Sequence, residues 1–167
     1  MPPPDKQAGT IVCNTGPLIA LAGIKQLSLM HDLYPRVRVA EAVFRELRGS
    51  KRFDSEAKAF ELQWLEAGAL LAAPDPLLRS ELGDGEAATI ALALQTNANR
   101  VLIDERKGRR IASLVYGLKV IGTGGILFAA KRKGLVKQIR PLMQHMRANG
   151  YFLSIRLVEG ICHAAGE

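Results

Sequence analysis

Short aliphatic runs alternate along the chain with segments whose apolar residues recur at helical spacing. The runs show no period-two alternation, which is typical of strands that are buried on both faces. The expected strands cover residues 10–13, 37–40, 70–73, 101–103 and 119–121. Helices are expected after Asn14 and over residues 27–34, 41–47, 55–67, 86–96, 105–116, 124–133, 135–147 and 155–164. This alternation predicts an α/β fold in which helices cover both faces of a parallel sheet.

Four polar residues stand out together. Asn14 follows the first strand and Asp104 the fourth, at the carboxyl ends where such sheets hold their ligands. Glu46 lies on a helix that follows a strand, and Glu86 opens an apolar helix. Each also suits an ordinary role: Asn14 and Asp104 as helix caps, Glu46 in a surface ion pair, and Glu86 at the positive end of a helix dipole. If these side chains converge, their mutual repulsion calls for a cation. Oxygen ligands suit Mg²⁺ or Mn²⁺, which can activate water and stabilise charge on a cleaved phosphodiester.

Composition narrows the class of protein. The chain has 167 residues, of which 48% are hydrophobic and 23% charged, which fits one domain with a buried core. No apolar run approaches the roughly 18 residues of a membrane span, and residues 1–6 lack the apolar stretch of a secretory signal. We therefore expect a cytoplasmic protein that does not enter the membrane. The two cysteines have no CxxC spacing, which argues against a disulfide framework or zinc ribbon, and Cys13 lies in an apolar run as expected for an inert buried thiol.

The positive charge is concentrated in one part of the chain. Residues 100–140 contain 11 Lys and Arg but only two acids, whereas residues 1–99 have a net charge of −2. Such a stretch attracts a polyanion such as RNA, although a solvated helix face would have the same composition. Only 5% of the residues are aromatic, so base stacking is restricted and any RNA contact is expected to be mainly electrostatic and salt-dependent.

Five segments of the chain follow one another in the order of a known family. They cover residues 11–21, 43–47, 82–87, 101–106 and 122–127. Together they resemble the PIN domain, and more closely a small prokaryotic PIN-like family of unknown function. The resemblance implies a three-layer α/β/α sandwich around a parallel sheet of about five strands. It covers the chain as a single domain, residues 1–167, with a core of about 10–135 and a C-terminal helical extension of about 136–167.

The same resemblance implies a function, which is metal-dependent cleavage of single-stranded RNA. It assigns Glu46, Glu86 and Asp104 as metal ligands, and it places Asn14 with them in the catalytic set. The family has an aspartate at the position of Asn14. The amide keeps one oxygen as a ligand but lacks the charge, so the metal affinity is expected to fall. Glu105 is a possible extra acid.

The resemblance also gives three candidates for contact with the substrate. They are Thr15, Arg109, which suits a phosphate contact or a solvated charge, and Thr123, which suits a helix cap whose N–H groups face an anion. Glu41 is a second candidate to compensate for the missing charge at Asn14. Many relatives are toxins held silent by a small antitoxin protein, and PIN-like proteins are commonly homodimers, so both kinds of partner are expected.

Three functions remain open from the sequence. The first is a Mg²⁺- or Mn²⁺-dependent ribonuclease. The second is a regulatory protein of the same fold that binds RNA or an antitoxin-like partner but cleaves poorly because of Asn14. The third is a doubly wound enzyme for a small molecule, whose crevice would use the same strand ends.

Overall fold

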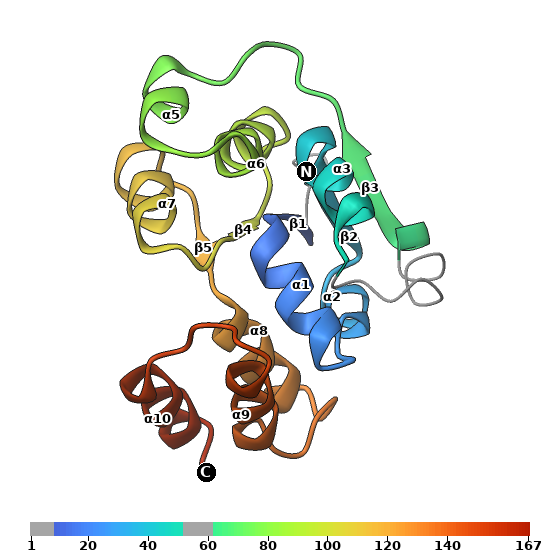
Figure 1. Cartoon of the computed structure of the whole chain (residues 1–167), viewed down its shortest axis with the longest axis vertical. Helices are drawn as coiled ribbons and strands as arrows, with labels where there is room; N and C mark the ends of the chain where they lie inside the picture. The colour runs from blue at the N-terminus through green and yellow to red at the C-terminus, as the bar shows by residue number, and fades with distance from the viewer. Residues whose placement is uncertain (1–8, 52–61) are drawn as a thin grey trace, which may run out of the picture.

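The computed structural model describes residues 9–51 and 62–167. Its strands form one fully parallel sheet in the order β3-β2-β1-β4-β5. The strands are β1 (Thr10–Cys13), β2 (Arg36–Ala40), β3 (Leu65–Gly68), β4 (Arg100–Leu102) and β5 (Val120–Ile121). Helices pack against this sheet (Figure 1), and the predicted α/β/α sandwich is confirmed.

The helices fill the connections between strands and then continue past β5. They are α1 (Thr15–Gly23), α2 (Ser28–Leu33), α3 (Glu41–Gly49), α5 (Pro76–Glu81), α6 (Asp84–Gln95), α7 (Arg106–Arg110), α8 (Thr123–Arg132), α9 (Arg140–Ala148) and α10 (Ile155–Ala164). Two short turns supplement them, η1 (Leu62–Trp64) and the π-helical η2 (Ile111–Val115). None of the helices in the described ranges is long and apolar enough to span a membrane.

The helix predicted to be apolar on nearly every side is the central one, α6. It packs against β1, β2 and β4 and also contacts α3 and α5. Ala87, Ala88, Ile90, Leu92 and Ala93 are all buried, as expected for a helix enclosed by other elements. Since α6 is held firmly, the residues of its first turn have a fixed position at the edge of the sheet.

The third strand lies earlier in the chain than expected. Residues 65–68 pair with residues 37–40 of β2, whereas residues 70–73 form no strand and Leu71 is 88% exposed. The expected strand at 70–73 was therefore wrong. The true strand contains Glu66, which forms ion pairs with Arg36 and Arg38 of β2. These ion pairs help to hold the edge strand, together with the buried Leu65.

The helices near β3 also differ from those expected. The amphipathic helix expected over residues 55–67 lies partly outside the described residues, and its final part is η1 followed by β3. In addition, α5 is a helix that was not expected from the sequence, and it begins in a segment that contains Pro74 and Pro76. Asp75 is its N-cap, because the carboxylate accepts a hydrogen bond from the Leu77 N–H at 2.8 Å, and Pro76 occupies the first helical position.

Candidate active site at the carboxyl edge of the sheet

The strand order creates a crevice between β1 and β4. The chain leaves β1 toward β2 on one side of the sheet and leaves β4 toward β5 on the other, which is the topological switch point where parallel sheets bind ligands. Asn14 and Asp104 follow these two strands, and the Asn14 N–H donates to the Leu102 carbonyl of β4 at 3.0 Å. Asn14 and Asp104, the two residues predicted from the ends of the strands, therefore lie at the switch point.

Three hydrogen-bond donors hold the Asp104 carboxylate. The Thr123 N–H donates to Oδ1 at 2.7 Å, and the hydroxyls of Thr123 and Tyr151 both donate to Oδ2. A carboxylate has about four acceptor positions, so little of its capacity remains free. Burial, followed by the neighbouring charge of Asp104, raises the pKa of Tyr151 and keeps its hydroxyl protonated as a donor. Tyr151 lies between α9 and α10, so the C-terminal helices contribute to the site.

Glu86 has the opposite surroundings. It is the third residue of α6, and its carboxylate accepts a hydrogen bond from the backbone N–H of Gly83, the N-cap residue, as in one half of a capping box. Its other oxygen, Oε1, is buried and has no hydrogen-bond partner in the described part of the chain. Burial raises the pKa of Glu86, and the charge of Glu105 raises it further.

Glu46 projects from α3 toward the beginnings of two other helices. Its Oε2 accepts a hydrogen bond from the Thr15 hydroxyl at 2.5 Å, which links α3 to the first residue of α1. The other oxygen lies beside Gly85 in the first turn of α6. Thr15 therefore orients an acid of the predicted set in this arrangement.

A glycine lies directly against each of the three acids. A Cβ built on Gly85 would lie 3.0 Å from Glu46 Oε1, and one on Gly108 would lie 2.9 Å from Glu86 Oε1. A Cβ on Gly122 would lie 2.9 Å from Asp104 Oδ1 and from Arg109 Nη1. These contacts connect α3 to α6, α6 to α7, and the end of β4 to the start of α8. Side chains other than hydrogen at these glycines would force the carboxylates to move.

The remaining predicted residues take varied positions. Arg109 is half-buried and its Nη1 donates to the Ile103 carbonyl at 2.8 Å, so it is not simply a solvated charge. Glu105 is exposed and acts on Glu86 through its charge. Glu41 is exposed at the first position of α3, and no contact joins it to the acids described above.

None of the three residues that suit a helix cap in the sequence caps the helix that follows it, and the N-cap of α7 is Glu105 rather than Asp104. Asn14 occupies the N-cap position of α1, but its side chain forms no cap hydrogen bond. The N-cap of α8 is Gly122, and Thr123 lies inside the helix with its hydroxyl on Asp104. The Thr123 side chain is thus held by the site rather than by helix capping.

Tyr151 and the three glycines were not found from the sequence. Tyr151 is 47 positions away from Asp104, and a tyrosine followed by two apolar residues carries no local signal of a site. Each glycine lies near a predicted residue in the sequence but contacts an acid from another segment. Gly85 precedes Glu86 but lies against Glu46, and Gly108 lies against Glu86 of the preceding helix. Gly122 precedes Thr123 but lies against Asp104. Such contacts depend on the tertiary structure.

The basic stretch does not form one continuous surface. Lys131 and Arg140 are engaged with acids of the C-terminal segment, Glu167 at 2.8 Å and Glu159 at 2.5 Å respectively. Lys107 pairs with Glu81 of α5 at 2.8 Å. Figure 1 shows α7 beside α5 and α6, whereas α8, α9 and α10 lie together at the other end of the molecule. Part of the excess charge therefore has a structural role, and the rest is divided between two regions.

A family model described as a PIN domain matches residues 10–167. The chain belongs to the PIN-domain family. No curated protein and no solved structure matches it. The PIN domain is a nuclease-type fold, and the expected resemblance in the sequence is confirmed as a family relationship over almost the entire length.

PIN domains generally use divalent metal ions. Within residues 9–51 and 62–167, no three His, Cys, Asp or Glu side chains are grouped so that they could hold a metal ion. Mg²⁺ needs only one or two carboxylates, with water and phosphate completing its coordination. Glu86 Oε1 is a buried oxygen without a partner, and Asp104 has about one acceptor position left. The PIN site therefore fits an ion held by few direct ligands.

The cysteine of β1 takes no part in this chemistry. Cys13 is fully buried, and burial strongly raises the pKa of its thiol. A thiol in such surroundings stays protonated and is a poor nucleophile. The prediction of an inert Cys13 is thus consistent with its position in the PIN core.

Proposed function

We propose that the protein is a nuclease that cleaves single-stranded RNA with Mg²⁺ or Mn²⁺. The observation that carries the proposal is the buried Oε1 of Glu86 at the carboxyl edge of the sheet, which has no hydrogen-bond partner among the residues that the structure describes. Burying an unsatisfied polar atom costs about 1–3 kcal/mol, and a cation would relieve that cost. Membership of a nuclease-type family favours this activity over that of a small-molecule enzyme.

Each acid would have a distinct task. Glu86 would hold the ion directly, and Asp104 would contribute the acceptor position that Thr123 and Tyr151 leave free. Glu46, held by Thr15, would contribute negative charge next to the start of α6. The bound ion would activate a water molecule and stabilise charge on the cleaved phosphate.

The neutral and cationic residues would act on water and substrate. The Asn14 amide has no cap hydrogen bond, so its oxygen and N–H groups are available to orient a water molecule. Arg109 is fixed through Nη1 to the Ile103 carbonyl, and its other N–H groups can bind a phosphate oxygen. Fixing the guanidinium reduces the side-chain entropy that is lost on binding.

A second function is favoured by the state of Asp104. Three hydrogen bonds already satisfy this carboxylate, and the fourth position of the set is the uncharged Asn14. A protein with that arrangement would bind RNA or a protein partner and cleave poorly. The two functions differ in one measurable property, which is metal-dependent turnover.

The deciding experiment is cleavage of a labelled single-stranded RNA with Mn²⁺, with Mg²⁺ or with EDTA. We expect cleavage with metal only, and a loss on the order of 100-fold in the Glu86→Gln variant, since even residues that support a metal ligand are worth about 10–100-fold. Glu159→Gln is the matched control, because Glu159 is exposed and its hydrogen bonds and ion pair are with Arg140 rather than with a residue of the site.

The opposite outcome is equally clear. Salt-sensitive RNA binding without cleavage, in both the wild type and Asn14→Asp, would contradict the nuclease proposal. Cleavage that appears only in Asn14→Asp would support the second function and identify Asn14 as its cause.

A further inference from the structure

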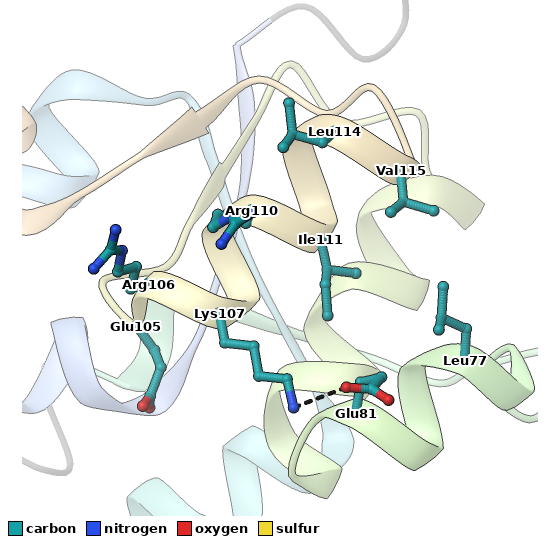
Figure 2. Close-up of a pocket in the computed structure, with 9 residues that line it drawn as sticks. All are labelled: Leu77, Glu81, Glu105, Arg106, Lys107, Arg110, Ile111, Leu114 and Val115. Carbon is teal, nitrogen blue, oxygen red and sulfur yellow. Dashed lines mark ion pairs between the residues drawn. The ribbon is translucent and has the colours of Figure 1, made fainter.

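A groove lies between α5 and the segment formed by α7 and η2, next to the candidate active site. Its volume is about 730 Å³, which is within the usual range of ligand pockets, about 300–1,000 Å³. Figure 2 shows Leu77 and Glu81 of α5 facing the residues of α7 and η2 across it. Glu105 also lines the groove, so the groove adjoins the carboxylate that raises the pKa of Glu86.

Aliphatic side chains form one half of the groove and are unusually exposed. Leu114 is 75% exposed, Val115 56% and Leu77 40%. The π-helical turn η2 widens the helix at this point, since the Tyr116 N–H bonds to the Ile111 carbonyl five residues back, and such turns are frequent at functional sites. Neighbouring exposed aliphatic residues of this kind mark interaction surfaces.

The other half of the groove is cationic. Arg106 and Arg110 are one helical turn apart on α7, so they lie on one face. No residue in the described ranges forms an ion pair with either of them, whereas Lys107 is already paired with Glu81 at 2.8 Å (Figure 2). Two guanidinium groups are thus available to carboxylates of a bound molecule.

We propose that this groove binds an acidic amphipathic helix from a partner protein. Two acidic residues one turn apart would pair with Arg106 and Arg110, and the adjacent aliphatic residues of that helix would cover Leu77, Leu114 and Val115. RNA fits the groove less well. Its lining contains no aromatic ring for a base to stack on, whereas its leucine, isoleucine and valine side chains suit the apolar side of a helix. The proposal does not depend on nuclease activity.

The test is fluorescence anisotropy with the full chain and three labelled probes. One probe is a helical peptide with leucines on one side and glutamates one turn apart beside them. The second is the same peptide with lysines in place of the glutamates, and the third is a short single-stranded RNA. We expect the acidic peptide to bind and the basic peptide not to bind.

Two variants and their controls locate the binding. Leu114→Glu and Arg110→Gln should each weaken the acidic peptide about tenfold, which corresponds to about 1.4 kcal/mol. Leu71→Glu and Arg156→Gln are the matched controls, because both residues are exposed and lie outside the groove. They should leave the affinity unchanged.

Several results would overturn the proposal. Equal binding of the acidic and basic peptides would show that Arg106 and Arg110 do not select the occupant, and absence of binding by the acidic peptide would reject it directly. Weakened RNA binding in Leu114→Glu, with no effect on the peptide, would assign the groove to RNA. A loss of dimers in Leu114→Glu without peptide binding would assign it to a second copy of the chain. None of these results depends on whether the protein cleaves RNA.

Discussion

Asp104 and Glu86 lie at the same edge of the sheet, but their surroundings are opposite. Asp104 accepts hydrogen bonds from one backbone N–H and two hydroxyls. One oxygen of Glu86 is bonded at the N-cap of its helix, and the other is buried with no hydrogen-bond partner among residues 9–51 and 62–167. The difference separates two tasks: the protein has fixed the orientation of Asp104 by its own donors, whereas Glu86 retains an unsatisfied atom that a cation can use.

The largest effect should come from neutralising each carboxylate. Asp104→Asn should lower the free energy of unfolding by about 2–3 kcal/mol, because hydrogen bonds to a charged group are worth about 1.5–3 kcal/mol and the new NH₂ group meets hydroxyl donors. Glu86→Gln should leave stability unchanged or slightly higher and reduce Mn²⁺ affinity. Chemical denaturation and Mn²⁺ titration on both variants measure the two properties. If both variants lose the same property to the same extent, the comparison is wrong.

The glycines allow each carboxylate to be displaced without being removed. Gly108→Ala would place a methyl group against Glu86 Oε1, and Gly122→Ala would place one against Asp104 Oδ1 and Arg109 Nη1. We expect Gly108→Ala to reduce Mn²⁺-dependent cleavage about tenfold or more, since displacements near 1 Å cost up to about 100-fold. Gly122→Ala should mainly reduce stability, because Asp104 cannot move without losing its hydrogen bonds.

Gly160→Ala serves as the control for both glycine variants. Gly160 is in α10 and has no atom within 4 Å of a built Cβ, so alanine there should be neutral or stabilise the helix. A cleavage loss in Gly160→Ala equal to that in Gly108→Ala would mean that glycine replacement acts through the fold in general.

Parts of this comparison could be predicted from the sequence. Asn14 and Asp104 were found because the carboxyl ends of parallel strands share an edge, a rule that needs only the position of each strand. Glu86 was found because it is an acid at the start of a helix that is otherwise apolar, so its position along the chain places it at the end of a buried element. The strand at 65–68 was missed because the ion pairs of Glu66 with Arg36 and Arg38, which help to hold it, join two strands.

The donors to Asp104 illustrate what the sequence could not reveal. Thr123 was expected to cap α8, and only the distance from its hydroxyl and N–H to Asp104 assigns it to the site. Tyr151 lies in the segment between α9 and α10, and its contact with the sheet edge depends on how these helices pack against α1 and α8. Likewise, Lys131 and Arg140 form ion pairs with Glu167 and Glu159, which lie near the end of the chain.

Removing the Tyr151 hydroxyl takes away one of the donors to Asp104 and leaves Glu86 unchanged. Tyr151→Phe keeps the ring and deletes one of the three hydrogen bonds to Asp104, so we expect a loss of about 1–2 kcal/mol in the free energy of unfolding. Tyr116→Phe is the matched control, because Tyr116 also has a hydrogen bond to a carboxylate, that of Asp75, but away from the site. Only Tyr151→Phe should also change Mn²⁺ affinity. An equal change in both variants would remove Tyr151 from the site.

The smallest effect concerns pH and tests the state of Glu86 itself. Because the folded-state pKa of Glu86 is raised, first by burial and then by Glu105, the folded protein holds this proton more tightly than the unfolded chain. Stability from Glu86 is therefore greatest at low pH, and it falls as pH rises from the ordinary carboxyl range, about 4.3, through the raised value. Glu86→Gln lacks this titration. In EDTA, the unfolding free energy of the wild type relative to Glu86→Gln should decrease over that interval and then stay constant. A difference that does not change with pH, or that rises with it, would show that Glu86 is not in the strained, partnerless state that distinguishes it from Asp104.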